Sequence, residues 1–160
     1  MAYSNVGATI NQLQGLVATA FGDSARQNQG LSLLPEIVRQ IATRAELDST
    51  LNLRVSAVGL FDNTNHFEVS TTPAVLIASV FDNTEAAANT PVIYDESPTE
   101  GTTVPRVALS MAASKLDVTV YLDPISMTDL YWSVIDGDAL TNSSTLAAAN
   151  SVRGFLVYAN

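Results

Sequence analysis

Phe61-Asp62-Asn63-Thr64 recurs twenty residues later as Phe81-Asp82-Asn83-Thr84. Each copy closes a short apolar run, residues 58–60 in the first case and 78–80 in the second. Short Asp and Asn side chains bond nearby backbone amides and tolerate left-handed geometry, which suits a turn. The repeat therefore predicts two buried strands, each of which finishes on a Phe and then turns.

The strand pattern extends over most of the chain after Asp48. Residues 116–122 alternate apolar and polar side chains, which predicts a half-buried strand, whereas residues 75–81 are nearly all apolar, which predicts a strand buried on both faces. We expect further strands at 53–61, 67–69, 92–94, 130–134 and 155–158. Asp136-Gly137 is a hairpin-type turn signal, and the segments 95–101 and 136–151 are expected to be loops.

The first 48 residues have a different periodicity. Apolar residues recur at spacings of three and four over 9–21, which predicts an amphipathic helix. A second helix is expected over 35–47, where Pro35 suits the first turn because its missing N–H has no helical partner there. The polar segment 22–30 between them is expected to be a loop.

These patterns indicate a mainly β fold, an antiparallel sandwich or barrel of which a jelly-roll-like arrangement is one form, with two N-terminal amphipathic helices. Residues 1–48 form a helical N-terminal arm and residues 49–160 one compact β body. The helices either dock on the core of that body or dock on a neighbouring subunit. For the second case the predicted interface residues are Ile37, Val38, Ile41, Arg39, Arg44 and Trp132.

Charged residues are scarce in this chain. They make up 14% of its 160 residues, against about 25% in typical domains. Because the cores of subunit interfaces are depleted of charge, the composition favours a surface that faces other subunits. The alternative is a thick sandwich whose surface is rich in Ser, Thr and Asn.

The charge that is present is unevenly placed. Residues 1–60 are balanced, and the whole net charge of −9 comes from residues 61–160. An acidic body repels phosphate backbones and anionic membrane surfaces, so neither nucleic acid nor a membrane is an expected direct partner.

The chain lacks the residues and motifs that most kinds of catalysis require. The chain has no Cys, one His (His66) and one Lys (Lys115), and it contains neither a Gly-x-Ser-x-Gly elbow nor a phosphate-binding Gly-rich loop ending in Lys. We therefore expect no enzyme activity and no cofactor. The N-terminus lacks the basic and apolar regions of a secretory signal, so we expect synthesis in a cytoplasm.

Four late acids are weak candidates for a cation site. Asp123, Asp129, Asp136 and Asp138 lie near one another in sequence, and Ca²⁺ prefers oxygen ligands, although EF-hand spacing is absent. With Trp132 or a Tyr as a stacking platform, they would suit a carbohydrate- or cell-surface-binding module. A small hydrolase using two of these carboxylates is a third hypothesis.

In its scarcity of charge, Lys, His and Cys, the whole chain resembles small virion proteins of tailed bacteriophages, such as capsid decoration or cement proteins and tail-tube proteins. The resemblance implies a protein that associates with itself and with other capsid or tail subunits. It also implies a place in the virion after assembly in the host cytoplasm. If the helices dock on neighbours, deletion of residues 1–48 should abolish assembly and leave the β signal largely intact.

Overall fold

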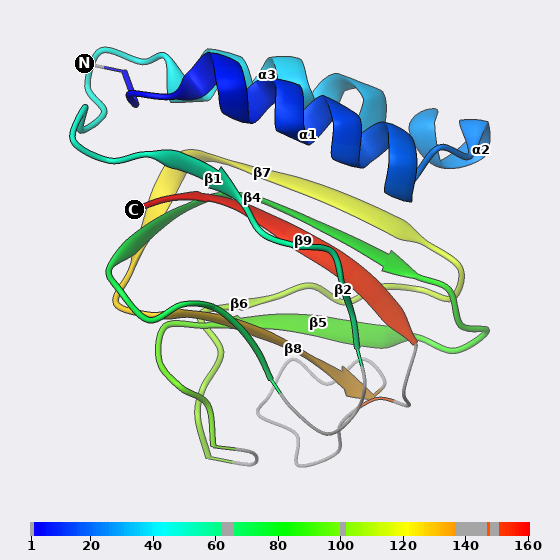
Figure 1. The fold of residues 1–160 in the computed structure, drawn as a ribbon. Helices are drawn as coiled ribbons and strands as arrows, with labels where there is room; N and C mark the ends of the chain where they lie inside the picture. Colours follow the sequence, from blue (N-terminus) through cyan, green and yellow to red (C-terminus); the bar gives the residue numbers. More distant parts are fainter. Residues whose placement is uncertain (1, 62–65, 100–101, 137–146, 148–150) are drawn as a thin grey trace.

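The molecule consists of three layers. The computed structural model describes residues 2–61, 66–99, 102–136, 147 and 151–160. A layer of helices covers one face of a first sheet, sheet A, and a second sheet, sheet B, covers the other face (Figure 1). Sheet A is therefore the middle layer.

The helical layer is formed by the first 42 residues. It contains α1 (Val6–Ala20), α2 (Ser24–Gln27), a 3-10 helix (Leu31–Leu33) and α3 (Leu34–Ala42). The first predicted helix is confirmed and begins three residues earlier than expected. The second is confirmed with Pro35 in its first turn, but it ends at Ala42 instead of residue 47. At this end the Thr43 hydroxyl donates to the Arg39 carbonyl. The short α2 lies in the predicted loop.

The two sheets are antiparallel throughout. Sheet A contains β1 (Leu53–Val55), β2 (Gly59–Leu60), β4 (Ala74–Asn83), β7 (Leu116–Met127) and β9 (Val152–Ala159). Sheet B contains β3 (Phe67–Ser70), β5 (Asn89–Tyr94), β6 (Val107–Ala108) and β8 (Leu130–Asp136). The predicted strands are thus confirmed, except that 53–61 divides into β1 and β2.

The order of the strands identifies the topology. Sheet A runs β1-β9-β4-β7, and β2 pairs with β9 beyond β1, so β1 and β2 act as two pieces of one edge strand. Sheet B runs β3-β8-β5-β6. The pairs β1/β2 with β9, β3 with β8, β4 with β7 and β5 with β6 are nested, as in one long hairpin that has been rolled up. This is the jelly-roll arrangement, and the sandwich is confirmed in preference to a closed barrel.

Two apolar cores hold the layers together. The first lies between the helices and sheet A and includes Ile10, Leu13 and Val38, while the second lies between the sheets and includes Leu76, Phe81 and Trp132. Because β4 has a core on each side, nine of its ten residues are buried. The prediction of a strand buried on both faces at 75–81 is confirmed. The division into an arm and a separate body stays a prediction, since the helices and sheet A share one core.

The repeat behaves differently from its prediction. In the second copy β4 does not end at Phe81 but continues through Asp82 and Asn83, and both side chains are fully buried. The Asn83 amide donates to the carbonyls of Ala87 and Ala112 at 2.9 and 3.1 Å, so it closes the next loop from inside the strand. In the first copy Phe61 is buried, and 62–65 lie outside the described residues. The turn predicted at Asp136-Gly137 and most of the loop 136–151 also lie outside them.

Candidate interaction surface

The apolar face of α3 is used inside the molecule. Val38 is fully buried and Ile41 is 2% exposed, and both belong to the core between the helices and sheet A. Their prediction as interface residues toward another subunit is wrong, because the helix docks on the core of its own chain. Ile37, one position away on the helix, is 36% exposed and stays available at the surface.

The two predicted interface arginines have partners within the chain. Arg39 lies 3.5 Å from Glu36 in an exposed pair, which contributes little to stability. The Arg44 guanidinium donates to the Leu122 carbonyl at 2.5 Å and lies 4.0 Å from Glu46. Arg44 therefore fastens the end of the helical layer to the outer strand of sheet A.

Trp132 is neither an interface residue nor a stacking platform. It is 1% exposed and stacks on Phe67, with the ring centroids 4.2 Å apart and an interplanar angle of 11°. Phe81 meets it edge-on at 5.2 Å. Since one face of the indole is covered by Phe67 and the side chain is buried, the expectations at this residue are wrong.

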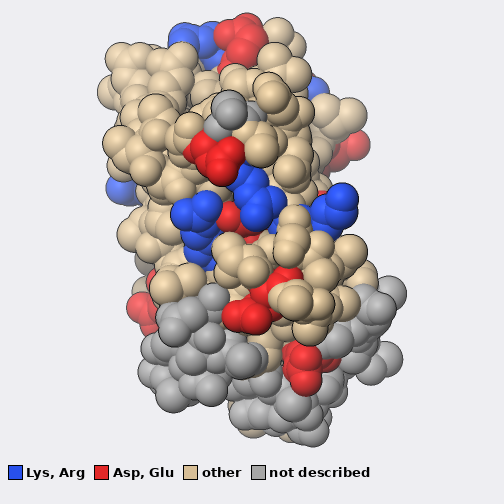
Figure 2. Space-filling view, turned by 90° about the vertical axis from the view of Figure 1, so that its right-hand side faces the viewer, with Lys and Arg blue, Asp and Glu red and all other residues tan. Residues whose placement is uncertain are grey.

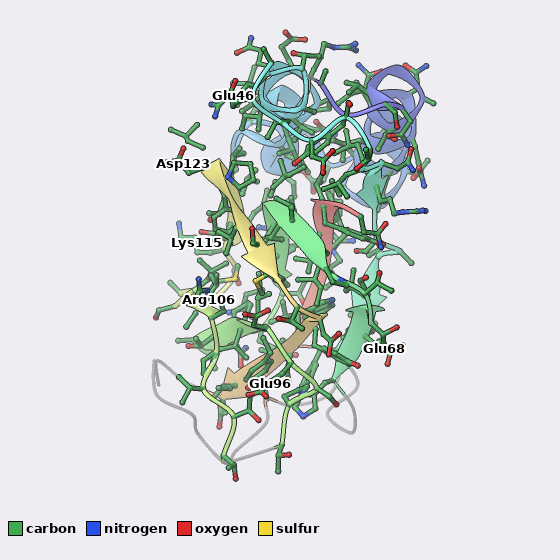
Figure 3. The ribbon with its side chains drawn as sticks, turned by 90° about the vertical axis from the view of Figure 1, so that its left-hand side faces the viewer. Glu46, Glu68, Glu96, Arg106, Lys115 and Asp123 are labelled. Carbon is green, nitrogen blue, oxygen red and sulfur yellow. The ribbon has the colours of Figure 1, made fainter. Side chains whose placement is uncertain are left out.

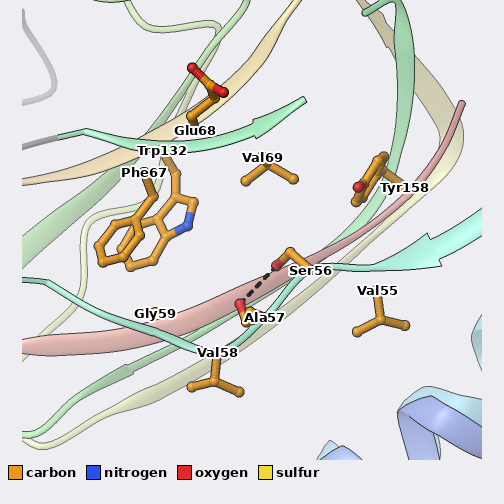
Figure 4. Close-up of a pocket in the computed structure, with 10 residues that line it drawn as sticks. All are labelled: Val55, Ser56, Ala57, Val58, Gly59, Phe67, Glu68, Val69, Trp132 and Tyr158. Atoms are coloured by element: carbon orange, nitrogen blue, oxygen red, sulfur yellow. Dashed lines mark hydrogen bonds between the residues drawn. The ribbon is translucent and has the colours of Figure 1, made fainter. Parts of the chain in front are cut away.

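A groove opens between the link from β1 to β2 and strand β3 (Figure 4). It encloses about 280 Å³ and is lined mainly by apolar side chains, with Glu68 as the charged group among those that line it. Glu68 accepts a hydrogen bond from the Tyr131 hydroxyl at 3.1 Å. Burial, followed by this hydrogen bond, raises the pKa of Tyr131. The groove thus offers apolar contacts and the carboxylate of Glu68, which is already hydrogen-bonded to the neutral Tyr131 hydroxyl.

The late acids do not form one cation site. Asp129 and Asp136 stand at opposite ends of β8, which at about 3.3 Å per residue separates them by roughly 23 Å. Asp123 lies on β7 in the other sheet, and Asp138 lies outside the described residues. In the part of the chain that the structure describes, no three Asp, Glu or His side chains converge as metal ligands.

A buried ion cluster was missed by the sequence analysis. Arg153 donates to Asp82 through Nε at 2.9 Å and lies 2.8 Å from it through Nη2, and Arg26 lies 3.3 Å from the other carboxylate oxygen. Arg153 also donates to the Ala20 carbonyl and stacks over the Phe21 ring. Figure 2 shows basic side chains gathered across the middle of this face, where the helices meet the sheets. The cluster ties α1 and α2 to sheet A. In the sequence its only trace is an Asp placed directly after the apolar run 75–81.

The lone His and Lys are placed separately. His66 lies beside Tyr94, with its ring edge-on to the Tyr ring at 5.8 Å. Lys115 is exposed immediately before β7, and its carbonyl accepts a hydrogen bond from the backbone N–H of Asn83 at 2.8 Å. The structure does not bring the two together.

The edges of sheet A carry exposed apolar side chains. Val58 and Leu60 are 37% and 48% exposed along the β1/β2 edge, and Leu122 is 64% exposed on β7 at the opposite edge. Unpaired sheet edges attract other strands, and proteins shield them with short strands or charges. The β1/β2 edge is broken into pieces of three and two residues, whereas β7 is twelve residues long. β7 is therefore the more extended candidate surface.

The comparisons with known proteins give no family. No family model matches the chain, and no curated protein matches it. Among solved structures, the chain is similar to the coat protein of Tobacco streak virus, with 9% sequence identity and a TM-score of 0.41 over 73% of this chain and 90% of that chain. A TM-score of this size does not establish a common fold.

Membrane insertion through helices has no support in the described ranges, where none of the helices combines the length and the hydrophobicity that a span requires. α1, the longest of them, has 15 residues, against about 20 for a typical span.

Proposed function

We propose that this protein is a non-enzymatic structural subunit that packs on copies of itself and on other subunits of a virion, as a capsid or decoration component. The observation that carries the proposal is the jelly-roll strand order of the two sheets. Viral capsid subunits, lectins and cupins are built on this arrangement. The step from fold to role is an analogy, so the side chains of this protein are the evidence that distinguishes these classes.

The residues disfavour the catalytic and sugar-binding classes. A catalytic metal site needs several His or carboxylate ligands, and among the residues that the structure describes no three such side chains lie together. Sugar binding uses exposed aromatic faces or a bound cation, but Trp132 is buried and the late acids are spread over two sheets. These findings leave the structural class with the best support.

The surface supports association with other subunits. Charged residues are few, and large apolar side chains are exposed on the helical layer at Leu33, on both edges of sheet A at Leu60 and Leu122, and in the segment before β6 at Val104. A surface with few charges and several exposed apolar groups is more stable in water when neighbours cover it.

The proposal is tested by the mass of the purified protein. Sedimentation velocity up to about 100 µM should reveal dimers or larger assemblies, because an association with a Kd in or below the micromolar range is largely complete at that concentration. A protein that remains monomeric at the highest concentration and does not bind pre-assembled particles would contradict the structural role.

The alternative is a carbohydrate- or cell-surface-binding module. The groove between the β1/β2 link and β3 is the feature that favours it. It predicts a monomer that binds a glycan array and loses that binding when Val69, on the groove wall, is replaced by Trp. Binding of this kind by a monomer would favour the module over the subunit.

A further inference from the structure

The hydrogen-bonding direction along β7 can be read from its contacts. β7 is the last strand of sheet A and pairs with β4 on one side only. The Lys115 carbonyl accepts from Asn83 on the β4 side, whereas the Leu116 amide donates to the Gln29 side chain and the Leu122 carbonyl accepts from Arg44. Backbone groups alternate in direction along an antiparallel strand. From Leu116 to Val120, where the pairing with β4 is regular, the even-numbered residues therefore direct their N–H and C=O groups away from the sheet.

Two residues in the middle of this edge are open. Gln29 and Arg44 cover the edge at Leu116 and Leu122, and between them lie Val118 and Val120, whose outward N–H and C=O groups meet neither side chain. Their side chains pack against the core under the helices. Val118 and Val120 thus present two N–H and two C=O groups at this edge, and their packed side chains hold the strand in place.

We propose that this edge pairs with the same edge of a second copy, antiparallel and about a two-fold axis at Thr119. The inference rests on the proposed self-association and names its surface. In this register Val118 faces Val120 of the second copy, and both residues have outward groups, so the two copies exchange hydrogen bonds. Sheet A then continues across the axis into the partner's sheet A.

Charge selects this register. With Thr119 on the axis, Lys115 faces Asp123 of the second copy, and the same pair repeats on the other side of the axis. Both residues are exposed, and both lie on the same side of the molecule in Figure 3. An axis moved to Val120 would instead place Asp117 opposite Asp123, where like charges repel. An axis at Val118 would leave Lys115 opposite the neutral Tyr121.

Apolar groups support the same arrangement. The pairing of β7 with β4 is irregular between Leu76 and Ala78, which leaves residues 121–124 of β7 as a bulge. Leu122 in that bulge is 64% exposed and falls opposite Leu116 of the second copy. In the dimer this contact replaces the hydrogen bonds that Arg44 and Gln29 make to the backbone of these two residues in the single chain. α3 contacts β4 and β7, so the element that carries the exposed Ile37 lies beside this edge.

The absence of cysteine allows a direct test. Thr119→Cys places one thiol from each copy on the axis, in a pair whose Cα atoms lie about 4.5 Å apart, within the range a disulfide spans. Mild oxidation of this variant should give a covalent dimer. Ser126→Cys is the control, because the exposed Ser126 lies seven residues from the axis and its thiols would be roughly 45 Å apart.

A charge exchange tests the register. Lys115→Glu and Asp123→Lys should each weaken dimerisation about 3- to 10-fold, since each change disturbs two symmetric exposed pairs, and the double variant should return to within about 2-fold of the original protein. If the original protein assembles but Thr119→Cys gives no covalent dimer, or the double variant shows no recovery, the β7 pairing is wrong and the structural role stands. If the original protein never assembles, both fail.

Discussion

Asp82 is one of the residues that fasten the helical layer to sheet A. Its carboxylate is fully buried and meets Arg153 and Arg26. Asp82→Asn would leave two guanidinium groups facing a neutral amide, and we expect a loss of about 3 kcal/mol in the free energy of unfolding. Urea titration measures it.

Glu36→Gln is the matched control for that change. Glu36 also pairs with an arginine, but its side chain is 61% exposed. Its replacement should change the free energy of unfolding by less than about 0.5 kcal/mol. Equal losses in the two variants would show that burial does not distinguish the pairs.

Two glycines should respond in opposite directions to alanine. A Cβ at Gly154 would lie 2.3 Å from Phe81 Cδ1 and 2.8 Å from the Val80 carbonyl oxygen, whereas a Cβ at Gly15 in α1 meets nothing within 4 Å. Gly154→Ala should therefore destabilise the protein by about 1–3 kcal/mol, and Gly15→Ala should stabilise it by about 0.5–1 kcal/mol. Thermal unfolding of both variants checks the signs. A tolerated Gly154→Ala would contradict the close packing of β9 on β4.

At the scale of single residues, the sequence predicted which side chains are buried better than it predicted which residues they contact. The period of 35–47 correctly marked Val38 and Ile41 as one apolar face, but periodicity cannot tell which surface that face meets. Asp82 was predicted to be a turn residue because local chemistry favours Asp in turns. Its partners Arg26 and Arg153 are distant in sequence, and only the folded sheet brings them together.

The helical layer is a structural element of the fold. Ile10, Leu13, Val17 and Val38 are buried against sheet A, and each buried side chain of this kind contributes about 1.5–3 kcal/mol. Removing residues 1–48 would expose this core and forfeit most of the roughly 5–15 kcal/mol that stabilises a domain. We therefore expect the truncated chain 49–160 to unfold or aggregate, as the competing prediction to a soluble β body that no longer assembles.

Circular dichroism and sedimentation of the chain 49–160 test that expectation. Val58→Ser on the β1/β2 edge is a control with an intact helical layer, because Val58 is 37% exposed. It should leave the thermal midpoint of unfolding nearly unchanged. A folded, soluble chain 49–160 would support the prediction of a separable arm.

Elements were predictable where their pattern is local. Alternation and apolar runs identified β3, β4, β8 and β9 to within three residues, and they identified β7 without its last five residues. The order of the strands was not predictable, because nested pairs such as β1 with β9 join residues about a hundred positions apart. The open edge of β7 depends on that order and so was also invisible in the sequence.

The whole molecule should lose stability at high pH through its tyrosines. Burial raises the pKa of Tyr121 and Tyr158 above the usual 10.0, although the hydrogen bond between Ser79 and Tyr121 opposes the shift at Tyr121 and Arg54 opposes it at Tyr158. A raised pKa in the folded state means that the stabilisation is complete below the unfolded value and is lost as the pH rises through the folded value. Urea titrations at about pH 8 and about pH 11 should show the decrease. A tyrosinate absorbance that develops in one step at the ordinary pKa, with the protein still folded, would contradict it.

Net charge opposes assembly of the whole molecule. Each copy carries −9, and two copies of this size have centres about 40 Å apart. Their repulsion is about 2 kcal/mol at roughly 0.01 M salt and falls well below 1 kcal/mol at about 0.15 M. The two Lys115–Asp123 pairs contribute only about 0.2–1 kcal/mol each, so at low salt the repulsion between the copies outweighs the attraction of these pairs.

Salt should therefore strengthen the assembly. Between about 0.01 and 0.15 M NaCl we expect the apparent Kd for dimerisation to fall at least about tenfold, because screening removes more repulsion than local attraction. Sedimentation equilibrium across the salt series measures the change, and sucrose in place of NaCl controls for solvent effects. A Kd that rises with salt would mean that the ion pairs at the β7 edge outweigh the net charge. In that case the Lys115→Glu variant should lose the salt dependence.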